Sequence, residues 1–82
     1  MIASWEPWSE EEAAALQKLR LDARMDSARF AMENAISHAQ LMQLENGGDA
    51  LFYSPAIKAH LGRKLIKKLQ TRAGASDTQH RF

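Results

Sequence analysis

The chain has 82 residues, no cysteine and a formal net charge of +1, and these numbers exclude several classes of protein. The length allows one small domain, because single domains usually run to ~100–150 residues. Without cysteine there is no disulfide framework, no thiolate zinc site and no cysteine nucleophile. Aromatic residues make up only 7% of the chain and valine is absent, whereas β-sheets are rich in aromatic and β-branched residues. We therefore expect a nearly all-α protein.

The first predicted helix begins at Ser9. Ser9 and Glu12 have the S-x-x-E spacing of a capping box, in which each side chain accepts from the backbone amide of the other residue. No glycine or proline follows until Gly47, which with Gly48 supplies the left-handed residue that commonly closes a helix. We expect one continuous helix over about 9–46, with a length of ~55 Å at 1.5 Å per residue.

The second predicted helix is shorter and basic. Ser54 is a favourable N-cap, and Pro55 suits the first helical position because the amide it lacks would be unpaired there. We expect this helix over about 54–72, before Gly74. Residues 1–74 would then form a single α-helical domain, and the polar tail over 75–82 is expected to be disordered.

These two helices differ in length, and a helical hairpin built from them would be incomplete. The second helix covers ~27 Å, so Leu16, Leu19 and Leu21 on the first helix would lack a neighbour. Either the first helix is buried against a second copy, which predicts a homodimer, or it breaks near 22–27. Asp26 or Ser27 could cap a new helix there, which would give a three-helix bundle.

The spacing of apolar residues favours the dimer. One line of alanines, methionines and a leucine repeats at intervals of four and three from Leu21 to Met42, which is a heptad pattern. A second line lies on the opposite face of the same helix, whereas a helix in a monomeric hairpin needs only one apolar stripe. A partner protein or a second copy would cover the second line. The residues expected to bind a partner are Trp5, Leu16, Leu19, Phe30, Leu41 and Leu44.

Charge is divided unequally between the two parts of the chain. Residues 1–50 carry nine acidic against four basic residues, a net of −5, and residues 51–82 carry seven basic against one acidic, a net of +6. The basic second helix could bind a polyanion, or two helices of opposite charge could simply complement each other. The candidate polyanion-binding residues are His60, Arg63, Lys64, Lys67, Lys68 and Arg72.

Residues that could carry chemistry are few. His38, His60 and His80 have no metal-ligand spacing, and no glycine-rich phosphate loop occurs. We expect no catalytic activity, no cofactor and no metal. Residues 1–12 carry four acidic residues, unlike the basic start of a secretory signal, and no apolar run reaches the ~20 residues of a membrane span. We expect a cytoplasmic protein.

Two resemblances point in different directions. Trp8-Ser9-Glu10-Glu11 followed by spaced leucines resembles the start of Myb-like DNA-binding helices over a short stretch, although the later tryptophans of that family are missing. The long helix, Gly-Gly-Asp turn and short helix resemble the layout of small helical-hairpin chaperones of type III secretion. Neither resemblance carries a residue role across.

The functional hypothesis from these patterns is a small bacterial or phage protein that binds and occludes a partner protein. It would act as an adaptor, a secretion co-chaperone or a virus-encoded inhibitor of a host protein. The alternative hypothesis is a small regulator that binds nucleic acid through the basic second helix.

Overall fold

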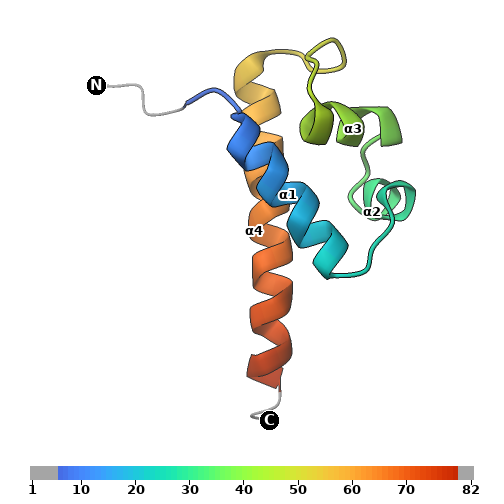
Figure 1. Ribbon diagram of the computed structural model, residues 1–82, viewed down its shortest axis with the longest axis vertical. Helices are drawn as coiled ribbons and strands as arrows, with labels where there is room; N and C mark the ends of the chain where they lie inside the picture. Colours follow the sequence, from blue (N-terminus) through green and yellow to red (C-terminus); the bar gives the residue numbers. More distant parts are fainter. Residues whose placement is uncertain (1–5, 80–82) are drawn as a thin grey trace.

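The computed structural model describes residues 6–79, with side chains described over 6–72, and this part of the chain is helical without any strand (Figure 1). The all-α prediction is confirmed. The four helices are α1 (Glu10–Asp22), α2 (Ser27–Glu33), α3 (His38–Asn46) and α4 (Pro55–Gln79). None of them is long and apolar enough to cross a lipid bilayer.

Three helix ends lie where the sequence predicted them. Ser9 Oγ accepts from the Glu12 amide at 3.0 Å, and the Glu12 carboxylate accepts from the Ser9 amide at 3.1 Å, so the capping box is present. Gly47 closes α3 with φ +109°. Pro55 is the first residue of α4, and Ser54 Oγ accepts from the Ile57 amide at 3.1 Å.

The prediction of one continuous helix over 9–46 is wrong, because the chain breaks twice. The first break lies near 22–27, as the alternative prediction had it. Arg24 has φ +60°, and Asp26 caps α2 by accepting from the amides of Ala28 at 2.9 Å and Arg29 at 3.2 Å. These side-chain hydrogen bonds replace the helical ones that the break removes.

The second break, at 34–37, was not anticipated. Ala35 has φ +59°, and Ser37 and Gln40 form another capping box, with both hydrogen bonds at 3.0 Å. With four helices, the alternative of a three-helix bundle is also incomplete. A left-handed alanine costs about 1–2 kcal/mol, and the packing that follows from the turn must offset this cost.

The predicted end of the second helix near Arg72 is wrong as well. Helix α4 passes through Gly74 and continues to Gln79. One glycine inside a helix costs only about 1 kcal/mol relative to alanine, and Ala73 and Ala75 on either side are the best helix formers. The expected disorder of the tail stays a prediction, and its last three residues lie outside the described part.

The two breaks let one chain bury its own apolar residues. Helix α1 packs along α4, and α3 packs against both α1 and α2 (Figure 1). Leu16, which a simple hairpin would leave uncovered, is 0% exposed. The buried apolar cluster takes residues from all four helices: Leu16, Met25, Phe30, Ala31, Leu41, Leu44, Leu65 and Leu69.

The prediction of a dimer assumed one continuous helix with two apolar faces, and this fold does not contain such a helix. The heptad line from Leu21 to Met42 is divided among three helices, so no single helix presents two apolar faces. Homodimerisation itself stays a prediction.

Candidate functional site

The residues expected to bind a partner lie mostly in the core. Leu16, Leu41 and Leu44 are 0% exposed, Phe30 is 2% exposed, and Leu19 is half-buried beside them. Their side chains pack within the chain itself, which explains their apolar character without a partner. Trp5 lies outside the described residues.

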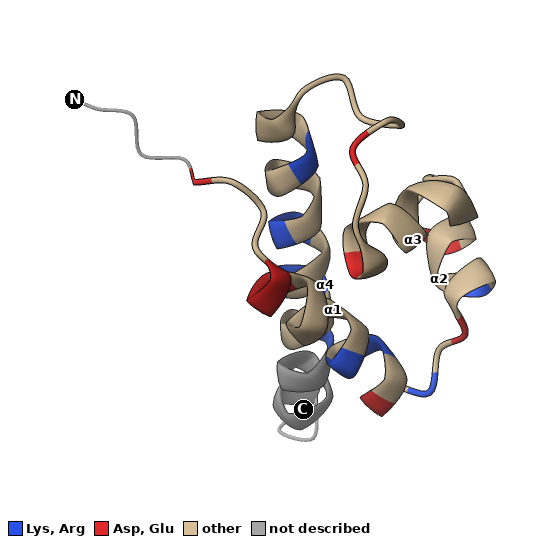
Figure 2. Ribbon diagram, turned by 45° about the horizontal axis from the view of Figure 1, so that its top comes forward, with Lys and Arg blue, Asp and Glu red and all other residues tan. Residues whose placement is uncertain are grey.

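The predicted polyanion-binding residues share α4 but not one environment. Five of them are exposed: His60, Lys64, Lys67, Lys68 and Arg72. Arg63 is instead bound by Glu6 and Glu12. Its Nε lies 2.6 Å from Glu12 Oε2, and its terminal nitrogen donates to the Glu6 carbonyl at 2.7 Å. The basic segments of α4 lie beside the acidic start of α1 in Figure 2, so part of the charge asymmetry is resolved inside the fold. Arg63 therefore has a structural role.

A different site emerges from α2, the turn 34–37 and α3. Two short helices joined by a turn of four residues have the order of elements of a helix-turn-helix. Helix α2 packs on α3, and the turn has its left-handed residue at Ala35, φ +59°. The Asn34 amide nitrogen donates to the Phe30 carbonyl at 2.8 Å and closes α2. The turn thus begins at a fixed residue, and the packing of α2 on α3 determines how the two helices are placed.

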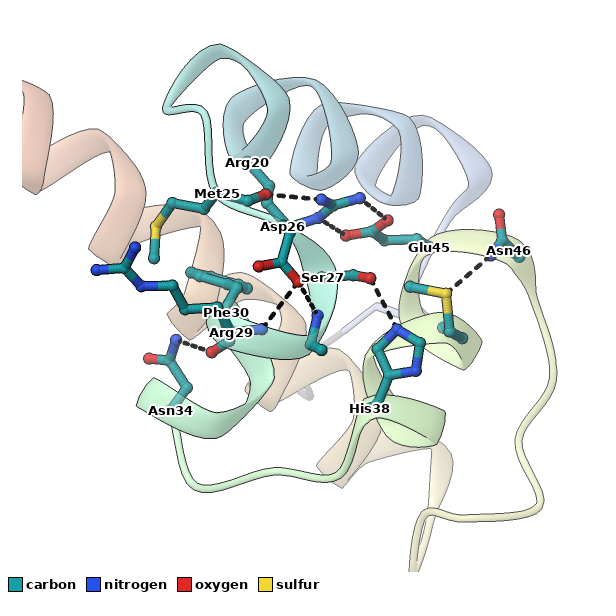
Figure 3. Close-up of polar contacts among 12 residues, drawn as sticks. Arg20, Met25, Asp26, Ser27, Arg29, Phe30, Asn34, His38, Glu45 and Asn46 are labelled. Carbon is teal, nitrogen blue, oxygen red and sulfur yellow. Dashed lines mark hydrogen bonds and ion pairs between the residues drawn. The ribbon is translucent and has the colours of Figure 1, made fainter.

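The exposed part of this unit is the N-terminal end of α3. Ser37, His38 and Ala39 are exposed. His38 Nε2 lies 2.7 Å from Ser27 Oγ, so a side-chain hydrogen bond links the first residues of α2 and α3 (Figure 3). The two helix starts therefore lie side by side on one surface, each capped by its own side chain, Asp26 or Ser37.

The other end of α3 is anchored by a buried ion pair. Arg20 of α1 donates to both Glu45 oxygens, at 2.7 and 2.9 Å, and its third contact is the Met25 carbonyl at 2.8 Å (Figure 3). The side chains of Arg20 and Glu45 are 7% and 0% exposed. The Glu45 carboxylate raises the pKa of Arg20 above its ordinary value by accepting these hydrogen bonds. The pair is a structural clamp, because neither group reaches the surface.

Loop 47–54 is held against α3 by two glutamines. Gln40 Nε2 donates to the Leu51 carbonyl at 3.2 Å, and Gln43 Oε1 accepts from the Leu51 amide at 3.1 Å. Lys58 of α4 donates to the Gly48 carbonyl at 2.7 Å and to Asp49 at 2.8 Å. The glutamines on α3 are thus occupied by the loop, and His38 and Ala39 are the exposed positions in the first turn of α3.

A groove of about 560 Å³ lies between α2 and α4. Phe30 and Leu69 are at its base, and four cationic residues line it: Lys64, Lys67, Lys68 and Arg72. Four of the six residues predicted to bind a polyanion are therefore brought together, but around a concave apolar surface that the sequence did not predict. Among the described residues, no three histidine or acidic side chains gather in a way that could hold a metal ion.

The helix-turn-helix was missed although the sequence carries a signal for it. Ser37 and Gln40 repeat the S-x-x-[E/Q] spacing of Ser9 and Glu12. This second capping box would have placed a helix start at residue 38, inside the helix that was expected to be continuous.

Comparisons with protein-family models, with curated protein sequences and with solved structures found no match.

Proposed function

We propose that the protein binds duplex DNA through the helix-turn-helix of α2 and α3. The observation that carries this proposal is the outward-facing start of α3, presented beside the start of α2 by a turn of four residues. In helix-turn-helix proteins the second helix enters the major groove with its N-terminal residues on the base edges, and the first helix crosses the backbone.

The dimensions of α3 suit this role. A helix with its side chains is about 10–12 Å across, which the major groove, about 12 Å wide, admits, and the nine residues of α3 form about 2.5 turns. The clamp between Arg20 and Glu45 fixes the far end of α3 without using its outer surface. A helix that must read a groove needs such support, because ordering it during binding would cost affinity.

The side chains at the start of α3 fit base contacts of a simple kind. His38 can donate or accept a hydrogen bond, and the Ala39 methyl can pack on a thymine methyl group. Arg24 and Arg29, both exposed near the start of α2, would contact phosphates. Arg29 also pairs with Glu33 at 3.1 Å, so this surface is only modestly cationic. We therefore expect weak non-specific affinity and a shallow dependence on salt.

The two functions expected from the sequence rest on different premises. Occlusion of a partner protein was inferred from a long helix with two apolar faces, which this fold does not contain. Nucleic-acid binding was inferred from the basic face of α4. The proposal keeps that class of ligand and moves the contact to α3.

The test is a fluorescence-anisotropy titration of a random-sequence duplex at two salt concentrations, followed by selection of preferred sequences from a duplex library. Ala39→Glu places a carboxylate on the outer surface of α3, near the helix start where an acidic residue does not disturb folding. We expect it to weaken binding at least tenfold. Ala15→Glu makes the same change on the exposed side of α1 and should leave binding unchanged.

Three results would contradict the proposal: no binding at low salt, equal binding by both alanine variants, or loss of binding in Lys64→Gln/Lys67→Gln but not in Ala39→Glu. The last result would return the contact to α4. Arg24→Gln should reduce the slope of log affinity against log salt by about one, as expected for one phosphate contact.

A further inference from the structure

We infer that the groove between α2 and α4 binds a small amphiphilic anion, a carboxylate on a short apolar body. The binding itself is independent of the proposed function. The further claim, that an occupied groove changes DNA affinity, rests on the proposed function.

The groove has the size and composition of a small-molecule site. Its volume of about 560 Å³ lies within the range of about 300–1,000 Å³ that such sites occupy. Phe30 and Leu69, 2% and 5% exposed, form its base. The aliphatic stems of the lysines extend this apolar surface while their charged ends stay in water.

Charge around the groove selects an anion. Lys64, Lys67, Lys68 and Arg72 face one carboxylate, Glu33. Glu33 is already paired with Arg29 at 3.1 Å and lies 3.9 Å from Arg72. Within the described part of the chain, Lys64 and Lys67 take part in no ion pair. Two uncompensated cations next to an apolar base match a ligand that carries both a negative charge and a hydrocarbon segment.

This combination favours an amphiphile over duplex DNA at the same place. Phosphate contacts need cations but no apolar base, so duplex DNA would leave the apolar part of the groove unused. An anionic lipid surface remains a different occupant, which the experiment below separates from a single dissolved molecule.

Lys68 and Arg72, which also line the groove, contact the residues that flank α2. Lys68 Nζ donates to Asn34 Oδ1 at 2.8 Å, and Arg72 contacts Met25 Sδ at 3.1 Å. Asn34 is the first residue of the turn that leads into α3. A carboxylate bound beside Lys64 and Lys67 also competes for the neighbouring Lys68, so it loosens the contact between α4 and the turn. Occupancy of the groove is therefore coupled to the position of α3.

The experiment is a calorimetric titration of the protein with octanoate below its micelle concentration, with 1-octanol and acetate as probes that lack the charge or the tail. We expect octanoate to bind at one site, and at least tenfold more tightly than either probe. Lys64→Gln/Lys67→Gln should weaken octanoate at least fivefold. Lys18→Gln removes an exposed positive charge that does not line the groove and should leave octanoate binding unchanged.

A second variant tests the groove without changing its charge. Thr71 is exposed and lines the groove, so Thr71→Trp should fill it and abolish octanoate binding in a folded protein. The inference is overturned if octanoate and acetate bind equally, if Thr71→Trp binds octanoate like the wild type, or if only phosphatidylglycerol vesicles bind.

Repeating the DNA titration with saturating octanoate tests the coupling, and a shift of at least threefold in affinity is expected. Octanoate binding in a protein that binds no DNA would contradict the proposed function and leave the groove assignment intact. DNA binding without any octanoate binding would contradict the groove assignment and leave the proposed function intact.

Discussion

Two arginine–glutamate pairs join distant parts of this chain with nearly the same chemistry in different surroundings. Arg20 donates to both oxygens of Glu45 and to one backbone carbonyl. Arg63 donates to both oxygens of Glu12 and to the carbonyls of Glu6 and Pro7. The side chains of the first pair are 7% and 0% exposed, and those of the second are 35% and 29% exposed.

Burial decides what each pair does. In the first, water cannot replace a lost partner, so removal of one member leaves an uncompensated buried charge. In the second, water and salt screen the interaction, so the pair orients the N-terminal segment at little thermodynamic gain. The buried pair therefore secures the placement of α3, whereas residues 6–9 are secured by Trp8, which packs against the core and donates to the Leu44 carbonyl.

The largest effect is expected from Glu45→Gln. The amide keeps the shape of the side chain but leaves the Arg20 guanidinium buried without a counter-charge, which should lower the free energy of unfolding by about 3–5 kcal/mol. Urea unfolding followed by circular dichroism measures this loss. A loss below about 1 kcal/mol would mean that water reaches the pair, and the contrast with the exposed pair would fail.

Replacing both Arg20 and Glu45 tests whether that loss comes from the uncompensated charge of Arg20. In Arg20→Met/Glu45→Leu no charge remains to be compensated, and buried ion pairs replaced by apolar residues of similar volume are often neutral or stabilising. We expect this double variant to be more stable than Glu45→Gln in the same urea titration.

An intermediate effect is expected from Gly62→Ala, which tests the packing of Trp8 on α4. A Cβ at residue 62 would lie 2.4 Å from Trp8 Cζ3, so the indole must move. Its Nε1 would then lose the hydrogen bond to the Leu44 carbonyl, now 2.8 Å long. Overpacking of this kind costs about 1–3 kcal/mol, partly offset by about 1 kcal/mol of helix propensity. Urea unfolding should show a net loss of up to about 2 kcal/mol.

The sign of this effect should reverse when the indole is absent. In a Trp8→Ala background the added methyl group meets no ring, so Gly62→Ala should stabilise the protein by about 1 kcal/mol through helix propensity alone. If Gly62→Ala lowers the free energy of unfolding equally in the wild type and in Trp8→Ala, contact with Trp8 is not the cause of the loss.

Local signals in the sequence predicted most helix ends, since a cap depends on residues three or four apart. The capping box at Ser9, the cap at Asp26 as an alternative, the end at Gly47 and the start at Pro55 are all present. The turn at 34–37 was missed because alanine, unlike glycine, gives no sign of a left-handed conformation. Its apolar spacing also continues across the break, so periodicity favoured one helix.

Contacts between residues far apart in sequence could not be predicted from local patterns. Arg20 and Glu45 are 25 residues apart, and nothing in the local pattern of either one names the other. The groove likewise depends on where the two breaks place α2 relative to α4. The basic residues of α4 were recognised, but the apolar base between them required Phe30 to be placed first.

The smallest effect is expected from Glu12→Gln, and pH gives it a recognisable signature. Glutamine preserves the capping box, so at pH 7 the loss should be several-fold smaller than for Glu45→Gln. Hydrogen bonds from Arg63 lower the pKa of Glu12 below its ordinary value of 4.5. The folded state therefore binds this proton less readily than the unfolded state does. The stabilisation is complete above about pH 4.5 and is lost as pH falls through the lower folded pKa.

Urea titrations of both proteins from pH 7 to pH 3 measure this difference. The other carboxylates contribute to both curves and cancel when one is subtracted from the other. The wild-type free energy of unfolding should fall more steeply than that of Glu12→Gln below about pH 4.5, until the two curves meet. Parallel curves over the whole range would mean that the pair is fully screened, and the N-terminal segment would then depend on Trp8 alone.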